Sequence, residues 1–145
     1  MITDLGCGDA ALARELLPKE MTVLSFDLVS DGAFVIEADI CAKVPLPGSE
    51  GVEGQKSEGE GHIVDVVVCA LSLMGTNWPS CIREAWRILK GGCVDSSILL
   101  TKYKLLTFLC SGELKIAEVT SRFTDLEEFT SLVNSIGFKL KSKVC

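Results

Sequence analysis

Gly6 and Gly8, together with the acids around them, form the part of the sequence best suited to hold a small molecule. The two glycines flank a single small residue directly after residues 1–5, which are expected to end a strand. Glycine permits a sharp turn and lets a ligand approach the backbone closely. In a doubly wound sheet, the first turn from strand to helix lies at the edge where ligands bind. The spacing therefore predicts cofactor contacts at Gly6 and Gly8.

Three aspartates are expected at the same edge of the sheet. Asp4 precedes the glycine turn, Asp27 ends the second predicted strand, and Asp39 ends the third. A carboxylate at Asp27 can accept hydrogen bonds from both hydroxyls of a ribose, and one at Asp39 can accept from an adenine amino group. The order acid-x-Gly-x-Gly is typical of methyltransferases that use S-adenosylmethionine. Acids attract its sulfonium cation and would repel a pyrophosphate, so charge favours the methyl donor.

The same residues have other interpretations. Gly6, Gly8 and Ala11 also match the dinucleotide fingerprint G-x-G-x-x-G/A, with Asp27 about 20 residues downstream to hold a ribose. This alternative predicts an NAD-dependent oxidoreductase, although a single match of this kind is weak. The glycine turn could also be a tight connection without a ligand, and Asp27 and Asp39 could be turn residues or helix caps. The joint spacing of the glycines and acids favours a cofactor site.

A second group of candidate residues follows the strand predicted over residues 64–71. Ser72 and Asn77 are weak candidates for holding an acceptor base, and no catalytic residue is assigned beyond them. A turn or a helix cap is the more usual role of an asparagine such as Asn77. Leu73 and Met74 could form an apolar wall against the cofactor or could pack in the core. The segment therefore predicts the acceptor side of the site.

Alternating strands and helices must position these residues. Such alternation predicts a parallel sheet with helices on both faces, which is an α/β, three-layer, Rossmann-like fold. Strands are expected over residues 1–5, 22–26, 34–36, 64–71, 114–119 and 138–144, and helices over residues 10–17, 81–90 and 125–137. Ser80 is expected to cap the second helix, which Gly91 and Gly92 would end. Residues 124–127 are expected to form a capping box that begins the third helix.

Length and composition limit the classes of protein to which the chain can belong. With 145 residues it is a single domain, and 48% hydrophobic with 23% charged residues exclude a disordered chain. The net charge of −6 provides no overall basic field for a phosphate backbone. Seven cysteines, an odd number without a C-x-x-C pair, indicate reduced thiols in a cytosolic or nuclear protein. We expect no metal site, since His62 is the only histidine, and no membrane segment.

Six segments together carry a resemblance to a known family. They are DLGCGDAALA, SFDLVS, ADICAKVPL, CALSLMGTN, EAWRILKGG and LKIAEVTSRFTDLEEF. They resemble the nucleomethylin family, also called ribosomal RNA-processing protein eight, and cover most of the chain. The resemblance implies a class I methyltransferase of the nucleus and nucleolus that uses S-adenosyl-L-methionine and methylates N1 of an adenine in large-subunit ribosomal RNA. It also implies a role in ribosome biogenesis and, for animal members, nucleolar protein partners that silence ribosomal DNA.

The resemblance also implies site residues. By motif position, cofactor contacts fall on Gly6, Asp27, Asp39, Ile40 and Ala70. Adenine N1 has its own lone pair, so methyl transfer to it depends on positioning and charge more than on a general base. The implied reaction therefore requires no strong base in this chain.

The chain departs from the family pattern in several places. The family carries a helical segment with a histidine ahead of the glycine turn, and a further sheet strand after the position of Cys145. The sheet is therefore expected to be incomplete at the N-terminal helix and at the last strand. Residues 93–112 are an apolar insertion, either an artefact of the gene model or an extra hairpin or helix. Residues 48–62, rich in Gly, Ser and Glu, are expected to be a flexible loop.

These departures leave a rival function open. A missing strand would leave a sheet edge unpaired, and the chain could then be a catalytically inactive cofactor- or protein-binding fragment of the same fold. Lys139, Lys141 and Lys143 alternate along the last predicted strand and could contact RNA, although a solvated strand face is the more usual explanation. The acidic composition predicts that RNA recognition depends on regions outside this chain or on a partner.

Overall fold

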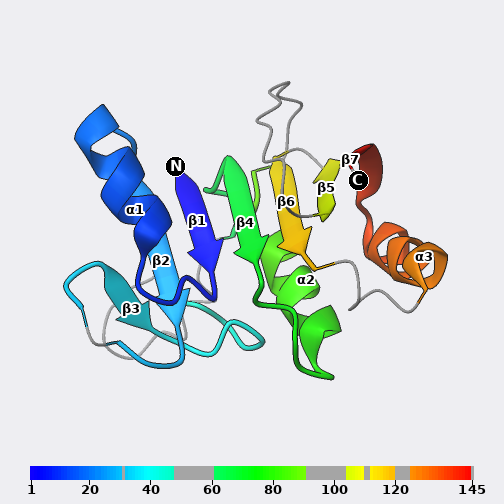
Figure 1. The fold of residues 1–145 in the computed structure, drawn as a ribbon, viewed down its shortest axis with the longest axis horizontal. Coiled ribbons are helices and arrows are strands. Elements are labelled where there is room, and N and C mark those ends of the chain that lie inside the picture. The colour runs from blue at the N-terminus through cyan, green and yellow to red at the C-terminus, as the bar shows by residue number, and fades with distance from the viewer. Residues whose placement is uncertain (31, 48–60, 91–103, 110–111, 120–124, 145) are drawn as a thin grey trace.

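The computed structural model describes residues 1–30, 32–47, 61–90, 104–109, 112–119 and 125–144. Within these ranges, seven strands form one sheet in the order β3-β2-β1-β4-β6-β5-β7 (Figure 1). The strands are β1 (Ile2–Leu5), β2 (Val23–Asp27), β3 (Val35–Glu37), β4 (Val66–Ala70), β5 (Lys104–Leu109), β6 (Glu113–Glu118) and β7 (Lys139–Val144). The helices are α1 (Ala11–Leu16), α2 (Trp78–Ile88) and α3 (Leu126–Ile136), and a 3₁₀ helix, η1, covers Leu17–Lys19.

The strands that carry the predicted site are parallel and adjacent. β1 lies between β2 and β4, β3 flanks β2, and β6 flanks β4, all in parallel register. Their carboxyl ends meet at one edge of the sheet, which is the lower edge in Figure 1. The chain order changes direction between β1 and β4, and such a switch point is where an open α/β sheet binds ligands. The Rossmann-like prediction is confirmed.

Helices cover both faces of the sheet. One apolar cluster joins α2 and α3 to the strands and contains Phe26 and Ile82, each 0% exposed. A second cluster joins α1 to β3 through Ala13 and Val35, with Val23 packed against it. Val23 and Phe26 are three residues apart in β2. Successive side chains of a strand alternate between faces, so these two side chains point to opposite faces of the sheet. The prediction of three layers is confirmed.

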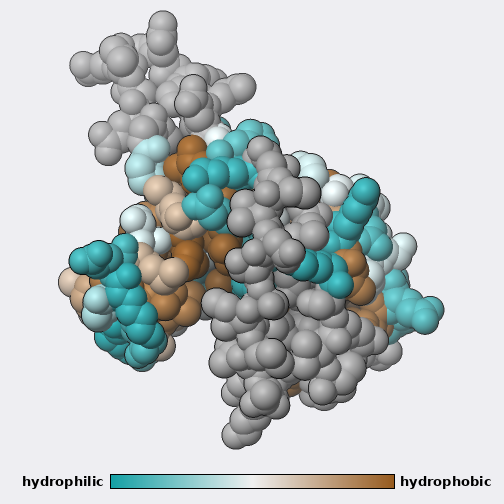
Figure 2. All heavy atoms as spheres, turned by 90° about the horizontal axis from the view of Figure 1, so that it is seen from above, coloured by the Kyte–Doolittle hydropathy of each residue, from teal (hydrophilic) through white to brown (hydrophobic). Residues whose placement is uncertain are grey.

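The helical layers present polar side chains to solvent. Seen from the amino ends of the strands, apolar side chains gather between hydrophilic outer sides (Figure 2). In α1, Ala13 is buried, whereas Arg14 and Glu15 are exposed. Glu15 and Lys19 form an ion pair on the exposed side. The helix therefore turns a narrow apolar face to the sheet, as expected of an amphipathic surface helix.

α2 begins three residues earlier than predicted. It starts at Trp78, and Pro79 fits its first turn because that position has no intrahelical partner for an N–H. Ser80 lies inside the helix, so its prediction as the cap is wrong. Asn77 holds the cap position, without a side-chain hydrogen bond.

α2 also ends two residues earlier than predicted. After Ile88 the backbone of Leu89 is extended and pairs with Val64 in a parallel bridge. The amides of residues 63 and 64 both donate to the Ile88 carbonyl at 3.0 Å. This pairing, rather than the following glycines, terminates the helix within the described residues. Gly91 and Gly92 lie outside them.

α3 is capped by Asp125, the second residue of the predicted capping box. The backbone of Asp125 is extended, and its Oδ1 accepts hydrogen bonds from the amides of Glu127 and Glu128 at 2.8 and 3.0 Å. Gly137 ends the helix as predicted, with a φ of +124°. Thr124 lies outside the described residues.

β5 occupies a position that the sequence did not predict. It lies between β6 and β7 and runs antiparallel to both, so that the backbone of Leu106 pairs with Ile116 on one side and with Lys143 on the other. The expectation of an unpaired edge beside the last parallel strand is therefore wrong. The described part of the insertion, residues 104–109, forms a hairpin with β6. Apart from Gly112, the rest of the insertion lies outside the described residues, as does most of the loop predicted over residues 48–62.

Candidate cofactor-binding site

The glycine turn follows β1 and is tied to the end of β2. Gly6 and Gly8 have φ values of +78° and +55°, in the left-handed region that favours glycine. The amides of Gly6 and Cys7 both donate to the carbonyl of Phe26, at 2.8 and 3.1 Å. The two neighbouring strands therefore fix the turn at the carboxyl edge of the sheet, as predicted.

Asp27 closes the turn from the side of β2. Its Oδ2 accepts a hydrogen bond from the Gly8 amide at 2.8 Å, and its Oδ1 accepts one from the Leu28 amide at 2.8 Å. An ionised carboxylate has about four lone-pair sites and can accept further hydrogen bonds. The structure thus brings Asp27 to the glycine turn and leaves acceptor capacity for a ligand.

Asp4 lies beneath the turn in a buried position. It is 5% exposed, and its Oδ1 has no hydrogen-bond partner within the part of the chain that the structure describes. Burial, and secondarily the charge of Asp27, raises its pKa from 3.8 to about 6. A cation at the turn would stabilise the ionised carboxylate, because an opposite charge favours the charged form. This unpaired acceptor fits a positively charged ligand.

The loop after β3 brings Ile40 against the turn and carries Asp39 directly before it in sequence. Asp39 is exposed, and its Oδ1 accepts a hydrogen bond from the Cys41 amide at 2.8 Å. Ile40 is 8% exposed, and its Cδ1 would lie 3.5 Å from a Cβ atom at Gly6. The same Cβ would lie only 2.3 Å from the Cβ of Ser72. Glycine at position 6 therefore allows the segments after β1, β3 and β4 to meet.

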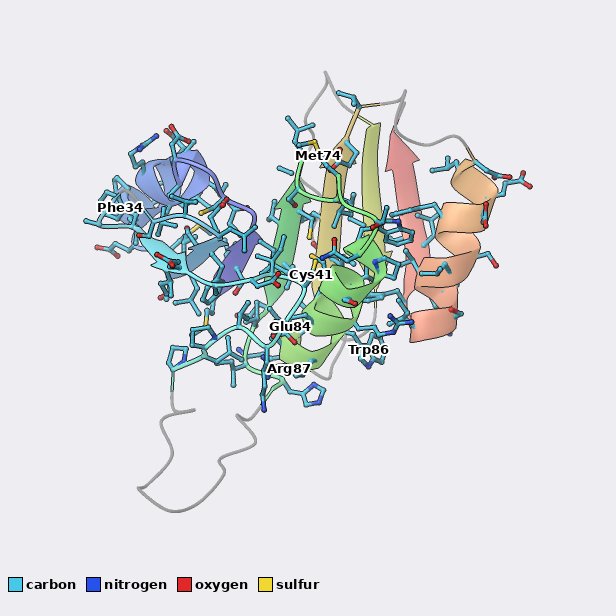
Figure 3. All side chains as sticks on the ribbon, turned by 90° about the horizontal axis from the view of Figure 1, so that it is seen from below. Phe34, Cys41, Met74, Glu84, Trp86 and Arg87 are labelled. Atoms are coloured by element: carbon cyan, nitrogen blue, oxygen red, sulfur yellow. The ribbon has the colours of Figure 1, made fainter. Side chains whose placement is uncertain are left out.

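The loop after β4, residues 71–77, forms the other side of the site and is called the β4 loop below. Ala70 ends β4 and is exposed, and Met74 is 59% exposed. In Figure 3, seen from the carboxyl edge, Met74 and Cys41 lie toward the middle of the molecule and Phe34 lies at the α1 end. A pocket of about 300 Å³ is lined by Leu73, Met74, Gly75, Thr76 and Trp78. The β4 loop thus carries a small pocket of mixed polar and apolar lining, and its Ser72 lies against the glycine turn.

The two weak catalytic candidates lie in different surroundings. Ser72 contacts the glycine turn, as the distance to a Cβ at Gly6 shows. Asn77 is exposed at the cap position of α2, and its Oδ1 would lie 2.5 Å from a Cβ at Gly75. Its side chain is therefore turned back over its own loop. Of the two residues, the structure brings only Ser72 to the predicted cofactor contacts.

A buried ion pair that the sequence pattern did not predict holds the loop after β3. Glu84 is 7% exposed, and its carboxylate accepts from the Val44 amide at 2.8 Å and from Arg87 Nε at 2.8 Å. Arg87 also donates to the Val44 carbonyl at 3.2 Å, and Figure 3 shows the two side chains adjacent. The available signal was an acid between buried Cys81 and Ala85 on a helix, because a buried carboxylate needs a partner.

Sequence analysis also missed Glu118, at the carboxyl end of β6. It is 1% exposed, and its Oε1 accepts a hydrogen bond from the Leu73 amide at 2.9 Å. Leu114 and Ile116 precede it on the same face of the strand and are both 0% exposed. An acid that continues an inward-facing apolar series was the signal that could have identified it.

The described cysteines are free thiols: Cys7, Cys41, Cys69 and Cys81. Burial, then the charges of Asp4 and Asp27, raises the pKa of the Cys7 thiol to about 11. This thiol is therefore protonated at neutral pH and a poor nucleophile. Among the residues that the structure describes, no three His, Cys, Asp or Glu side chains are grouped to hold a metal ion. No helix in the described ranges is long and apolar enough to cross a membrane.

The basic stripe predicted along β7 is interrupted at its centre. Lys141 Nζ lies 3.5 Å from Glu113 Oε1, and Lys115 Nζ lies 2.9 Å from Glu113 Oε2. Glu113 is 3% exposed, so both lysines are drawn toward a buried carboxylate. This pairing favours the interpretation of a strand face with local ion pairs over that of an RNA-binding stripe.

A family model described as "Hypothetical methyltransferase" matches residues 1–104. The chain belongs to this methyltransferase family. The matched span contains the glycine turn, Asp27, Asp39, Ile40 and Ala70, which are all the residues predicted to contact a cofactor. The predicted methyltransferase resemblance is confirmed, and the family match covers the part of the chain on which the cofactor site was predicted.

Curated relatives resemble the chain over almost its whole length. It is 37% identical to "25S rRNA (adenine(645)-N(1))-methyltransferase" of Schizosaccharomyces pombe, over 98% of this chain and 35% of the relative. It is 39% identical to "Ribosomal RNA-processing protein 8" of Dictyostelium discoideum, over 98% of this chain and 28% of the relative. For the protein of the same name from Mus musculus, the identity is 36%, over 97% of this chain and 23% of the relative. The chain thus spans about a third or less of these relatives.

Proposed function

We propose that this chain carries the methyl-donor site of an S-adenosyl-L-methionine-dependent methyltransferase that acts on ribosomal RNA. The observation that carries the proposal is the buried Asp4 carboxylate, whose Oδ1 has no hydrogen-bond partner among the described residues, beside Asp27 at a glycine turn. Family membership and the names of relatives, two of which state adenine-N1 methylation of 25S rRNA, support it. The proposed target is accordingly N1 of an adenine in large-subunit ribosomal RNA, and the proposed process is ribosome biogenesis.

The residues at the carboxyl edge fit this donor. Asp27 would accept hydrogen bonds from the ribose hydroxyls, and Asp39 would accept one from the adenine amino group. Asp4 would face the cationic part of the donor, since its buried Oδ1 lacks a hydrogen-bond partner among the described residues. Backbone and side-chain contacts from Gly6, Gly8, Ile40 and Ala70 would complete the site. The same acids would repel the two phosphates of a dinucleotide, so charge disfavours dinucleotide binding.

The work of the chain in this reaction is positioning. The donor, when bound, supplies an electrophilic methyl group. Adenine N1 presents its own lone pair, so the chain needs to hold the acceptor base in line and to exclude competing geometries. Ser72 lies beside Gly6 on the acceptor side of the turn and is the proposed contact for that base. Asn77, turned toward Gly75, is a weaker candidate.

The acidic composition of this chain does not account for RNA affinity. A net charge of −6 provides no general attraction for phosphates, and Lys141 is engaged by Glu113. We therefore propose that RNA affinity resides in protein regions that this chain does not include, or in a nucleolar protein partner. A nuclear, nucleolar location is proposed with it, in keeping with the ribosomal RNA-processing names of the relatives.

Isothermal titration calorimetry with S-adenosylmethionine, and in parallel with NAD, tests the donor site. We expect micromolar binding of the methyl donor and no binding of NAD. Asp27→Asn and Asp39→Asn should each weaken the binding about 10-fold or more, because each removes a charged hydrogen-bond acceptor. Asp9→Asn is the matched control, since Asp9 lies next to the turn but pairs with Arg14, and it should leave the affinity unchanged.

The opposite results identify the rival functions. Binding of NAD in place of the methyl donor would favour an oxidoreductase. No binding of the methyl donor at millimolar concentration would favour a fragment that lacks the cofactor site. If the donor binds, transfer of a labelled methyl group to a large-subunit rRNA fragment, with the methylated position mapped by mass spectrometry, tests the acceptor.

A further inference from the structure

The β4 loop is tied to the end of β6 at two points. The Leu71 amide donates to the Ala117 carbonyl at 2.9 Å, which extends the parallel ladder by one backbone hydrogen bond. Two residues later, the Leu73 amide donates to Glu118 Oε1 at 2.9 Å. The second tie depends on a side chain and is therefore a property of this sequence rather than of the sheet.

Burial of the Glu118 carboxyl group costs free energy unless hydrogen bonds offset the loss of water. The side chain is 1% exposed and continues the inward series of Leu114 and Ile116, where an apolar residue would satisfy packing. Removing a carboxyl group from water costs several kcal/mol in general, and hydrogen bonds to it must offset this cost. The hydrogen bond to the Leu73 amide is such an offset, and it links the strand to the β4 loop.

The hydrogen bond from Glu118 adds to the packing of Leu73 against the main apolar cluster in holding the β4 loop. Leu71 has a φ of +57°, a left-handed conformation that costs about 1–2 kcal/mol for a residue with a side chain. Leu71 and Met74 are 41% and 59% exposed, so burial of these side chains does not hold the loop in place. The two hydrogen bonds to β6 thus maintain a strained turn.

The tie fixes the part of the β4 loop that faces the glycine turn. Ser72 stands between the two tied amides, and its Cβ would lie 2.3 Å from a Cβ at Gly6. Any outward or inward shift of Leu73 therefore moves Ser72 relative to the turn. We propose that Glu118 is a positioning residue that holds the β4 loop, and with it the acceptor side of the methyl-transfer site, against the glycine turn. This inference rests on the proposed function.

Two substitutions separate the hydrogen bond from packing. Glu118→Gln keeps a carbonyl oxygen that can accept from the Leu73 amide, whereas Glu118→Met keeps similar volume without a good acceptor. Asp125→Ala is the control for general destabilisation, because it removes the cap of α3 at a distance from the site. All variants are made in the full chain, with thermal unfolding recorded for each.

The readouts are hydrogen exchange of the Leu73 amide, donor affinity by calorimetry and kcat for methyl transfer to the rRNA fragment. In Glu118→Met we expect faster exchange at Leu73 and a kcat about 100-fold lower, because small misplacements of reacting groups have effects of this size. Donor affinity should change much less than kcat, since Asp27 and Asp39 are not attached to the β4 loop. Glu118→Gln should restore most of kcat, and Asp125→Ala should leave kcat and Leu73 exchange unchanged.

The outcomes distinguish this inference from the proposed function. Unchanged exchange at Leu73 in Glu118→Met would overturn the inference whatever the activity. An unchanged kcat in Glu118→Met, with a wild-type chain that binds the donor and transfers methyl groups, would overturn it as well. A wild-type chain that binds no S-adenosylmethionine would overturn the proposed function itself, and the inference with it.

Discussion

The two halves of the sheet differ in strand direction. In the first half, β3, β2, β1 and β4 are parallel, and the loops that follow them meet at one edge around Gly6. In the second half, β6, β5 and β7 alternate in direction, and β5 and β6 form a hairpin. The first half carries the residues proposed to hold the donor, and the second supplies a side chain, Glu118, that reaches back across to the β4 loop. A site proposed for the first half would thus depend on a strand end in the second.

We expect the largest loss of stability from a substitution that disrupts β5. Leu106 pairs on both sides, with Ile116 and Lys143, so proline at this position would break a central ladder. Leu106→Pro should lower the free energy of unfolding by about 3 kcal/mol or more, measured by urea denaturation. Leu106→Val, which keeps a strand-forming residue, should cost far less. Equal stability of the proline variant and the wild type would show that the second half does not need β5.

The next largest effect is expected from a substitution at Gly6, which lies against Ser72 in the first half of the sheet. A Cβ at Gly6 would meet Ser72 at 2.3 Å and would sit on a left-handed backbone with φ of +78°. Gly6→Ala should therefore destabilise the fold by about 2 to 3 kcal/mol, from backbone strain plus overpacking. It should also abolish donor binding in calorimetry.

Two other glycines are matched controls for Gly6→Ala. Gly8 has a φ of +55° but nothing within 4 Å of a Cβ, so Gly8→Ala should show the backbone cost of about 1 to 2 kcal/mol alone. Gly32 has neither a positive φ nor a close neighbour, so Gly32→Ala should leave the thermal midpoint nearly unchanged. A ranking other than Gly6, Gly8, Gly32 would contradict the packing of the turn against the β4 loop.

The third effect concerns pH and the buried Asp4. Its pKa in the folded chain is about 6 against an ordinary 3.8, so the folded state holds more protons than the unfolded state between these values. The contribution of Asp4 to stability is therefore greatest below pH 3.8 and is lost as pH rises through 6. The shift corresponds to at most about 3 kcal/mol, and Asp4→Asn at pH 7.5 should recover about 1 to 2 of it, because the amide N–H group is also buried.

The same substitution should separate stability from function. Asp4→Asn should flatten the stability profile between pH 4 and pH 6 relative to the wild type, measured by denaturation at several pH values. In the wild type, donor affinity should rise with pH through about 6 as the carboxylate becomes ionised, and in Asp4→Asn it should not. A stabilised variant with undiminished donor affinity would contradict the role proposed for Asp4.

The smallest effect is local to the second half. The Asp125 side chain caps α3 through the amides of Glu127 and Glu128. Asp125→Ala should lower the free energy of unfolding by about 1 kcal/mol, measured by thermal denaturation. Donor affinity should stay the same, because the cap is remote from the glycine turn. A large loss of affinity would show that the two halves are coupled through α3 as well as through Glu118.

Sequence reasoning performed well where structure is decided locally. The glycine turn, the aspartates at strand ends and the continuous apolar run of β4 each identify their own element within about ten residues, so the parallel half could be predicted. The helix ends were less accurate. α2 stops at Ile88 because Leu89 pairs with Val64, a partner about 25 residues away that no local pattern indicates.

The inserted segment shows the same limit in a stronger form. The apolar composition of residues 93–112 could not distinguish a helix, a hairpin or a spurious segment, because short apolar runs fit each of them. The pairing of residues 104–109 with β6 and β7 selects a hairpin over a helix for this part of the segment, and it places a paired strand where the sequence suggested an unpaired edge.

By itself, the sequence determined the class of fold, the glycine turn and the acids at the carboxyl edge, because turn chemistry and alternating hydrophobic patterns act over short distances. Only tertiary packing brings Ile40 and Ser72 together at Gly6, buries Asp4 with its Oδ1 unpartnered among the described residues, and places Glu118 within hydrogen-bond reach of the Leu73 amide. These features depend on which strands lie side by side and on how far each side chain is removed from water. Both are set by the packing of the whole sheet rather than by any single segment.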